Sequence, residues 1–104
     1  MYIGTLSYDV ESDTFTGELS TLGLRSRLAI SPAVKAGPKS PDYKVFIPSE
    51  SGATEIGAGW KRKSEREGEL VSLRLDDPTF PKPLNCLLFA VTDDDSDYLL
   101  EWRR

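Results

Sequence analysis

Histidine is absent from the 104 residues of this chain, and cysteine occurs once, at Cys86. Histidine is the commonest general base and metal ligand, so its absence excludes histidine-activated serine nucleophiles and zinc sites built from cysteine and histidine. The single Cys86 cannot form an internal disulfide, which fits a reducing, cytoplasmic location. We therefore expect a protein that is not an enzyme and that holds no cofactor and no metal.

Long hydrophobic runs are also absent. No apolar run approaches the ~20 residues that a membrane-spanning helix needs, and the first residues show no basic leader followed by an apolar stretch and a cleavage site. With 38% hydrophobic and 29% charged residues, the composition is that of a globular protein rather than a disordered one. We expect one domain over residues 1–104, without a signal peptide and without a membrane partner.

Apolar and polar residues alternate with a period of two through most of the chain, which is typical of half-buried strands. Eight short segments show this pattern or are apolar throughout: 2–8, 14–19, 22–30, 43–47, 55–63, 70–76, 84–91 and 98–102. Only the apolar segment 84–91 also fits a short buried helix. The predicted fold is all-β, a single small antiparallel meander that closes into a barrel or a two-sheet sandwich of about eight short strands.

Segments 55–63 and 70–76 form the clearest predicted strand pair. Alternation predicts an inner face of the first strand that holds Ile56, Ala58 and Trp60. Gly57 and Gly59 then lie on the outer face, where they indicate either the curvature of a barrel or the close approach of a ligand. Trp60 and Trp102 lie on apolar strand faces, and we interpret both as core residues.

Basic residues fall mainly on the outer faces of the predicted strands. The outward residues that could contact nucleic acid are Arg25, Arg27, Lys44, Phe46, Lys61, Lys63 and Arg74. If their strands are neighbours, they combine cations for phosphates with an exposed ring for base stacking, as single-strand-binding proteins do. The alternative is that they are the ordinary cations of a sheet that faces water. Either DNA or RNA would satisfy the first interpretation.

Acidic residues gather in two predicted turns, Asp9–Asp13 and Asp93–Asp97, and the net charge of the chain is −4. Segment 92–97 has part of the spacing of a calcium-binding loop but lacks its glycine and glutamate, so we interpret it as a turn. Asp76 and Asp77 suggest a metal site or an acid–base pair. No motif supplies further ligands for them, so turn capping is the preferred interpretation.

Several short motifs occur in a distinctive order. They are Ile3-Gly4-Thr5-Leu6, Phe15-Thr16-Gly17, residues 22–28, 40–46, 55–61 and 73–81, and Trp102 near the end of the chain. In this order and spacing the chain resembles the domain of unknown function 736 family over nearly its whole length. Residues 49–52 depart from the family pattern as an insertion. The resemblance implies a small bacterial protein of plasmids and integrative elements, and it supplies no catalytic residues.

Two functions follow from these observations as hypotheses. The first is a non-enzymatic accessory protein of a mobile genetic element that binds nucleic acid through the basic strand faces. The alternative is an acidic inhibitor of host defence or of a transfer regulator, which would mimic nucleic acid through its acidic turns. A homodimer through uncovered sheet edges is a further expectation. Residues 31–42 form a long predicted loop, which is either functional or mobile.

Overall fold

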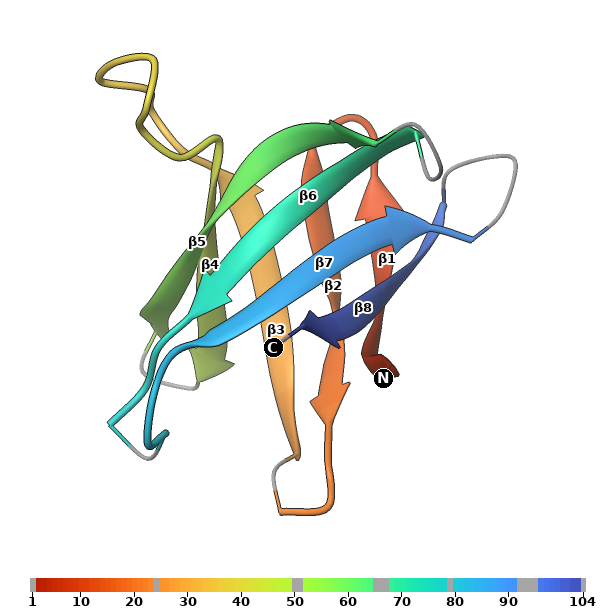
Figure 1. Cartoon of the computed structure of the whole chain (residues 1–104), viewed down its shortest axis with the longest axis vertical. Coiled ribbons are helices and arrows are strands. Elements are labelled where there is room, and N and C mark those ends of the chain that lie inside the picture. The colour runs from red at the N-terminus through yellow and green to blue at the C-terminus, as the bar shows by residue number, and fades with distance from the viewer. Residues whose placement is uncertain are drawn as a thin grey trace.

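The eight predicted strands form one closed antiparallel barrel in the computed structural model, which describes residues 2–23, 25–49, 52–64, 68–78, 80–91 and 96–103. Each strand pairs with the next along the chain, and the last pairs with the first (Figure 1). The strands are β1 (Tyr2–Asp9), β2 (Thr14–Ser20), β3 (Arg25–Pro32), β4 (Tyr43–Ser49), β5 (Gly52–Ser64), β6 (Gly68–Leu75), β7 (Leu84–Ala90) and β8 (Asp97–Arg103). The all-β prediction is confirmed, with a barrel rather than a sandwich.

The inward side chains of the strands fill the barrel, as expected for eight strands. The main core cluster comprises Ile3, Leu6, Phe15, Leu19, Leu28, Ile30, Tyr43, Val45, Ile56, Val71, Leu73, Leu75, Cys86, Leu88 and Leu100. Cys86 is a free, buried thiol on β7, the segment that could also have been a helix. Burial raises the pKa of this thiol to about 11. The described ranges contain no helix with the length and hydrophobicity needed to cross a bilayer.

Closure of the barrel leaves no edge among the eight strands, because each pairs on both sides. The β1–β8 pairing completes the ring, with Gly4 opposite Leu100 and Leu6 opposite Tyr98. The edges that the predicted homodimer required are therefore missing from the described sheet.

A bulge in β5 reverses the prediction of which residues of this strand face inward. Val45 pairs with Gly57 and Phe46 pairs with Glu55, so Ile56 is an extra residue in β5. One extra residue changes the face on which every following side chain lies. Ala58 and Trp60 consequently lie on the outside of the barrel. The sequence pattern predicted them to lie in the core. Gly57, Gly59, Lys61 and Lys63 take the inward positions, opposite Leu75, Leu73, Val71 and Glu69 of β6.

The glycines of β5 allow neighbouring groups to approach closely, as barrel curvature requires. A Cβ atom on Gly57 would lie too close to the carbonyl oxygen of Arg74 on β6. A Cβ on Gly59 would lie 2.6 Å from Cδ2 of Leu73 inside the barrel. Of the two hypotheses for these glycines, the contacts therefore favour curvature over ligand approach.

The alternation in segments 2–8 and 22–30 also predicts that Tyr2, Leu22 and Leu24 face inward. For Tyr2 and Leu22 this prediction is wrong. Tyr2 points outward, 60% exposed, because a bulge separates it from Gly4, and its ring lies against Phe89 with centroids 6.1 Å apart. Leu22 is fully exposed, since β3 begins only at Arg25. Leu24, the other leucine expected at this position, lies outside the described residues. Trp102 packs against the core, as predicted.

The two ends of the barrel differ. Both ends of the chain, marked N and C, and the described residues 76–78 and 80–83 of the proline-rich segment lie toward one end, in the lower half of Figure 1. There Phe80 packs against the core and helps to enclose a small cavity of about 160 Å³ with Leu28, Ile56 and Leu75. Backbone hydrogen bonds at 2.6 Å from Asp76 N to the Ile56 oxygen and at 2.9 Å from Phe80 N to the Asp77 oxygen hold this segment in place. The opposite end is open.

Candidate functional site

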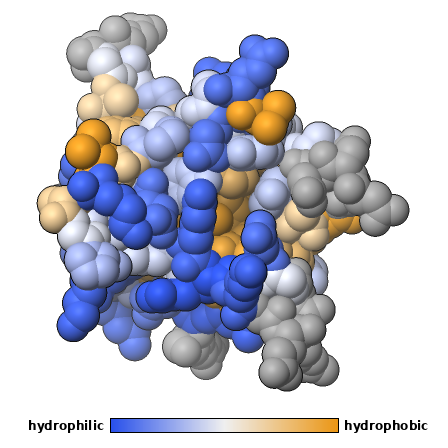
Figure 2. Space-filling model, turned by 90° about the horizontal axis from the view of Figure 1, so that it is seen from above, coloured by the Kyte–Doolittle hydropathy of each residue, from blue (hydrophilic) through white to orange (hydrophobic). Residues whose placement is uncertain are grey.

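The open end of the barrel holds a cavity of about 540 Å³. Its lining includes four aromatic side chains, Tyr8, Phe15, Tyr43 and Tyr98, from β1, β2, β4 and β8. Seen from this end, hydrophobic atoms lie at the bottom of a hollow surrounded by hydrophilic ones (Figure 2). The cavity therefore combines an apolar interior with a polar rim.

Phe15 lies at the centre of the aromatic cluster. Its ring centroid is 4.7 Å from that of Tyr8, 4.9 Å from that of Tyr98 and 5.6 Å from that of Tyr43. The contacts with Tyr98 and Tyr43 are edge-to-face, an arrangement that the quadrupoles of the rings favour. Mutual packing fixes the four rings as one wall of the cavity.

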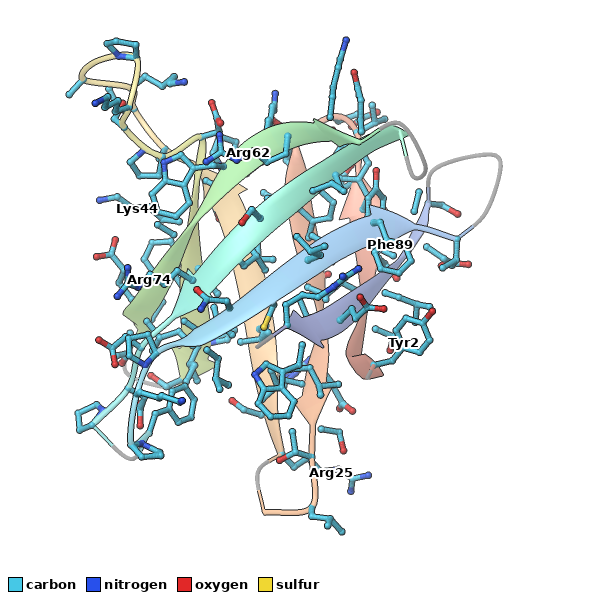
Figure 3. All side chains as sticks on the ribbon, viewed as in Figure 1. Tyr2, Arg25, Lys44, Arg62, Arg74 and Phe89 are labelled. Carbon is cyan, nitrogen blue, oxygen red and sulfur yellow. The ribbon has the colours of Figure 1, made fainter. Side chains whose placement is uncertain are left out.

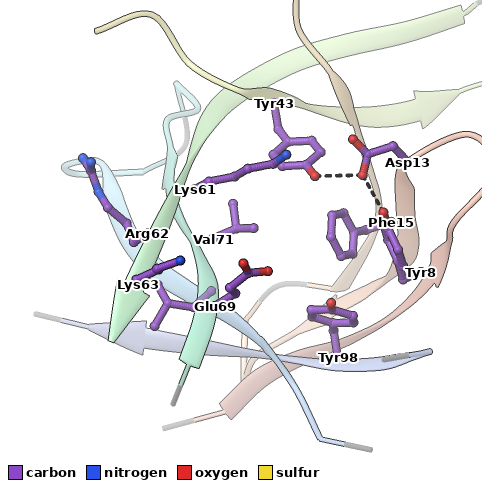
Figure 4. Close-up of a pocket in the computed structure, with 11 residues that line it drawn as sticks. Tyr8, Asp13, Phe15, Tyr43, Lys61, Arg62, Lys63, Glu69, Val71 and Tyr98 are labelled. Carbon is purple, nitrogen blue, oxygen red and sulfur yellow. Dashed lines mark hydrogen bonds between the residues drawn. The ribbon is translucent and has the colours of Figure 1, made fainter. Parts of the chain in front are cut away.

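Asp13 links two of these rings. It lies in the β1–β2 turn with a positive φ of 54°, a conformation that aspartate adopts more readily than most residues. Its Oδ1 accepts hydrogen bonds from the hydroxyls of Tyr8 at 2.7 Å and Tyr43 at 2.8 Å (Figure 4). The bond to Asp13, together with burial, raises the pKa of Tyr8 to about 12. Burial has the largest effect on the pKa of Tyr43, and the hydrogen bond to Asp13 has the next largest; both raise this pKa. Both hydroxyls therefore stay protonated as donors.

Two lysines of β5 enter the cavity from the other side. The Nζ atom of Lys61 lies 5.7 Å from the centroid of the Tyr43 ring, within the range of a cation–π contact. Lys63 lies opposite Glu69 in the β5–β6 register, and both line the cavity. Figure 4 shows Lys61 reaching toward Tyr43, whereas Arg62 points to the other side of the strand. Lys61 and Lys63 thus line the cavity, and their prediction as outward-facing residues is wrong because of the β5 bulge.

The loop between β3 and β4 fixes the position of Lys61. Asp42 accepts a hydrogen bond from the backbone N–H of Lys61 at 2.8 Å and forms an ion pair with Lys35 at 2.9 Å. These two interactions, the first the stronger, lower the pKa of the Asp42 carboxyl. Trp60 donates its indole N–H to the backbone oxygen of Lys39 at 3.2 Å. This long loop is thus tied to β5 beside the cavity.

The predicted nucleic-acid residues do not form one surface. Lys44 and Arg74 align on the outer face through Ala58, with which both pair. They line a shallow groove of about 410 Å³ with Trp60. Lys44 also forms an exposed ion pair with Glu55 at 3.2 Å. Phe46, two residues after Lys44 on β4, is half-buried.

Arg25 and Arg27 are exposed on β3. Figure 3 places Arg25 near the bottom of the barrel, away from Lys44 and Arg74. The seven predicted residues therefore divide into Lys44 and Arg74 in the outer groove, Phe46 on β4 outside its lining, a separate pair on β3, and two lysines that line the cavity.

The acidic turns are only partly described. Asp9 is exposed in the first turn, whereas Asp13 turns inward to the tyrosines. Asp93, Asp94 and Asp95 of the second turn lie outside the described residues. Among the residues that the structure does describe, no group of three or more histidine, cysteine, aspartate or glutamate side chains could hold a metal ion.

Sequence reasoning missed the aromatic lining of the cavity, although a signal was present. Tyr8 is the second-last residue of β1, and Phe15, Tyr43 and Tyr98 come at or next to the start of β2, β4 and β8. In an antiparallel meander, the ends of odd-numbered strands and the starts of even-numbered strands lie at the same end of the sheet. Combining topology with these positions would have brought the four rings together.

The fold and site define a class, a small up-and-down β-barrel with an aromatic cavity at one open end. The chain belongs to the family described as "Protein of unknown function (DUF736)", whose model matches residues 2–104. This confirms the family expected from the motifs. No curated protein and no solved structure matches the chain. The family description carries no function, so a role in a mobile genetic element stays a prediction.

Proposed function

We propose that this protein is a non-enzymatic binding module that takes a compact ligand into the open end of its barrel. The ligand would carry a planar ring and an anionic group. The observation that carries the proposal is the meeting of Lys61 and Lys63 with four aromatic rings around one cavity of about 540 Å³. Cavities of ~300–1,000 Å³ are typical of sites for small ligands.

The lining of the cavity matches such a ligand chemically. A planar ring would exchange water for contacts with the half-buried rings of Tyr8 and Tyr98, and burial of apolar surface contributes roughly 25 cal/mol per Å². An anionic group would meet the ammonium groups of Lys61 and Lys63, neither of which forms an ion pair with a described residue. Eight-stranded barrels are wide enough to hold one small ligand when side chains leave their mouth unfilled.

Binding rather than catalysis is proposed because the cavity offers no activated nucleophile. Tyr8 and Tyr43 hold their protons near neutral pH, since their pKa values are raised. The thiol of Cys86 is buried on β7 and is not part of the cavity lining. Cytoplasmic residence and an accessory role in a mobile genetic element remain parts of this proposal.

A fluorescence titration with anilinonaphthalene sulfonate, an aromatic anion that brightens in apolar sites, tests the proposal. We expect saturable binding of one probe per barrel. Replacement of both Lys61 and Lys63 by methionine should weaken it at least tenfold, because each charge-assisted contact is worth about 1.5–3 kcal/mol. Lys82→Met, which removes an exposed lysine from the segment at the closed end, is the matched control. Binding of equal strength in the double variant and the control would refute the proposal.

Nucleic-acid binding is the second candidate, favoured by the outer groove. There Lys44 and Arg74 stand beside Trp60, over a floor that includes Gly57 and Ala58. A ring beside two cations combines a surface for base stacking with charges that neutralise phosphates. The net charge of −4 opposes long-range attraction of nucleic acid, which is why this candidate stands second.

Fluorescence anisotropy with a labelled single-stranded oligonucleotide tests this second candidate. Arg74→Met should weaken binding and reduce its salt dependence, whereas Arg25→Met on the separate β3 surface is the control. Affinity that changes with neither Arg74→Met nor added salt would exclude the groove. The inhibitor hypothesis rests on Asp93–Asp95, outside the described residues, and it stays a prediction.

A further inference from the structure

The Asp13 carboxylate lines the cavity and can accept more hydrogen bonds than the two that it accepts from tyrosines. A carboxylate offers about four lone-pair sites, and both tyrosine hydroxyls use the same oxygen, Oδ1. Oδ2 makes no hydrogen bond to any residue that the structure describes. Tyr8 and Tyr43 hold the carboxylate in one orientation, so the cavity wall contains a fixed acceptor for a ligand's N–H group.

Cations and acceptor lie on different sides of the cavity. Asp13 comes from the β1–β2 turn, whereas Lys61 and Lys63 project from β5 (Figure 4). Phe15, Tyr43 and Tyr98 line the same cavity. A matching ligand therefore has a planar ring, a hydrogen-bond donor at one edge and a negative group at the other end.

The geometry points to a nucleotide as this ligand, an inference that rests on the proposed function and specifies its ligand class. The exocyclic amino group of the base donates to Oδ2 of Asp13, and the base packs among the aromatic rings. The phosphate lies between Lys61 and Lys63. Two ammonium groups suit a phosphate dianion better than the single charge of a carboxylate.

Two kinds of ligand have this chemistry: a free mononucleotide, and an unstacked nucleotide within a single strand. In both, the base leaves water or a stack and packs against a ring of the cavity. The structure specifies the shared chemistry, and the experiment below distinguishes the sources.

Isothermal titration calorimetry with mononucleotides tests the inference. CMP and AMP carry an exocyclic amino group, whereas UMP and IMP carry a carbonyl oxygen at the same position. We expect the wild-type chain to prefer CMP over UMP and AMP over IMP by about ten- to a hundredfold, the value of one hydrogen bond to a charged group. Cytidine and ribose 5-phosphate, which lack the phosphate and the base respectively, should each bind at least tenfold more weakly than CMP.

Asp13→Asn gives the sharpest variant. If the asparagine oxygen continues to accept from both tyrosines, its NH2 group replaces Oδ2 and becomes a donor. The preference should then reverse, with UMP bound more tightly than CMP. A near-ultraviolet circular dichroism spectrum like that of the wild type shows that the variant is folded. If Asp13→Asn does not fold, Lys61→Met with Lys63→Met still tests the inference, because this variant should lose the advantage of CMP over cytidine.

A competition experiment with a single-stranded cytidine oligonucleotide separates the two sources. Displacement of CMP by the oligonucleotide at a lower concentration of nucleotide units identifies the single strand, and failure to displace identifies the free nucleotide. The inference is overturned by an unchanged CMP-to-UMP ratio in Asp13→Asn, by equal affinity for CMP and cytidine, or by binding of a zwitterionic aromatic amino acid in place of nucleotides. Binding of the sulfonate probe without nucleotides overturns the inference alone, and binding of neither overturns the proposed function as well.

Discussion

Replacement of Asp13 by asparagine should destabilise the barrel while leaving the β1–β2 turn in place. Asparagine tolerates the positive φ of 54° at this position, so the change acts on the hydrogen bonds from Tyr8 and Tyr43. A hydrogen bond to a charged group contributes about 1.5–3 kcal/mol, and a neutral one about 1 kcal/mol. Water offsets part of the loss at the partly exposed Tyr8. The free energy of unfolding should therefore fall by about 1–2 kcal/mol, or Tm by roughly 5–15 °C.

The same variant should change the ionisation of the tyrosines. In the wild-type chain the pKa of Tyr8 is raised from its ordinary value of 10.0 to about 12, first by the hydrogen bond to Asp13. A raised pKa means that the folded chain holds its proton longer than the unfolded chain. The resulting stabilisation is complete below about pH 10 and is lost as the pH rises toward 12. Ultraviolet absorbance of tyrosinate should show earlier ionisation in Asp13→Asn.

Asp9→Asn provides the control from the same turn. Asp9 is exposed and accepts hydrogen bonds from the Ser12 hydroxyl at 2.9 Å and the Glu11 N–H at 3.2 Å. Asparagine can replace it, so stability should stay within about 0.5 kcal/mol of the wild type. If urea unfolding gives the same free energy for both variants, and the tyrosine titration of Asp13→Asn matches the wild type, the carboxylate does not hold the rings and the reasoning fails.

Three further predictions concern the packing of the barrel. Gly17→Ala should lower the free energy of unfolding by about 1–3 kcal/mol, because the added Cβ would lie too close to the Thr5 carbonyl oxygen and 2.7 Å from the Leu6 Cα. Gly37→Ala is the control, since a Cβ at Gly37 meets open space. Equal urea midpoints for the two variants would contradict the prediction. Phe80→Ala should cost about 1–3 kcal/mol, less than a fully buried phenylalanine, because Phe80 is only half-buried at the closed end; a melting temperature equal to the wild type's would show that the ring does not close the barrel. Cys86 should resist a thiol-specific disulfide reagent in the native chain and react fully in denaturant, since it is buried and its pKa is raised to about 11; rapid reaction of the native thiol would contradict the core packing.

The local alternation of apolar and polar residues was enough to predict the strands. Alternation in segments such as 14–19 and the apolar run at 84–91 determine which residues can line a core, and short turns between them favour an antiparallel meander. These signals are local, because a strand's two faces follow from a period of two in the chain. The family motifs likewise lie in the sequence, and the family match confirms them.

Only the tertiary structure decided the direction of the β5 side chains and hence the candidate site. An extra residue in a strand leaves no mark on the alternation of that strand alone, since the Ile56 bulge exists only relative to β4. This bulge carries Lys61 and Lys63 into the barrel and Trp60 to its surface. The cavity likewise depends on closure of the barrel. Closure brings the ring centroids of Tyr8 on the first strand and Tyr98 on the last strand to 5.8 Å from each other. The sequence by itself determined the strands and, where no bulge occurs, their apolar faces. The register between strands decided which groups meet at the open end, because register is a relation between distant segments.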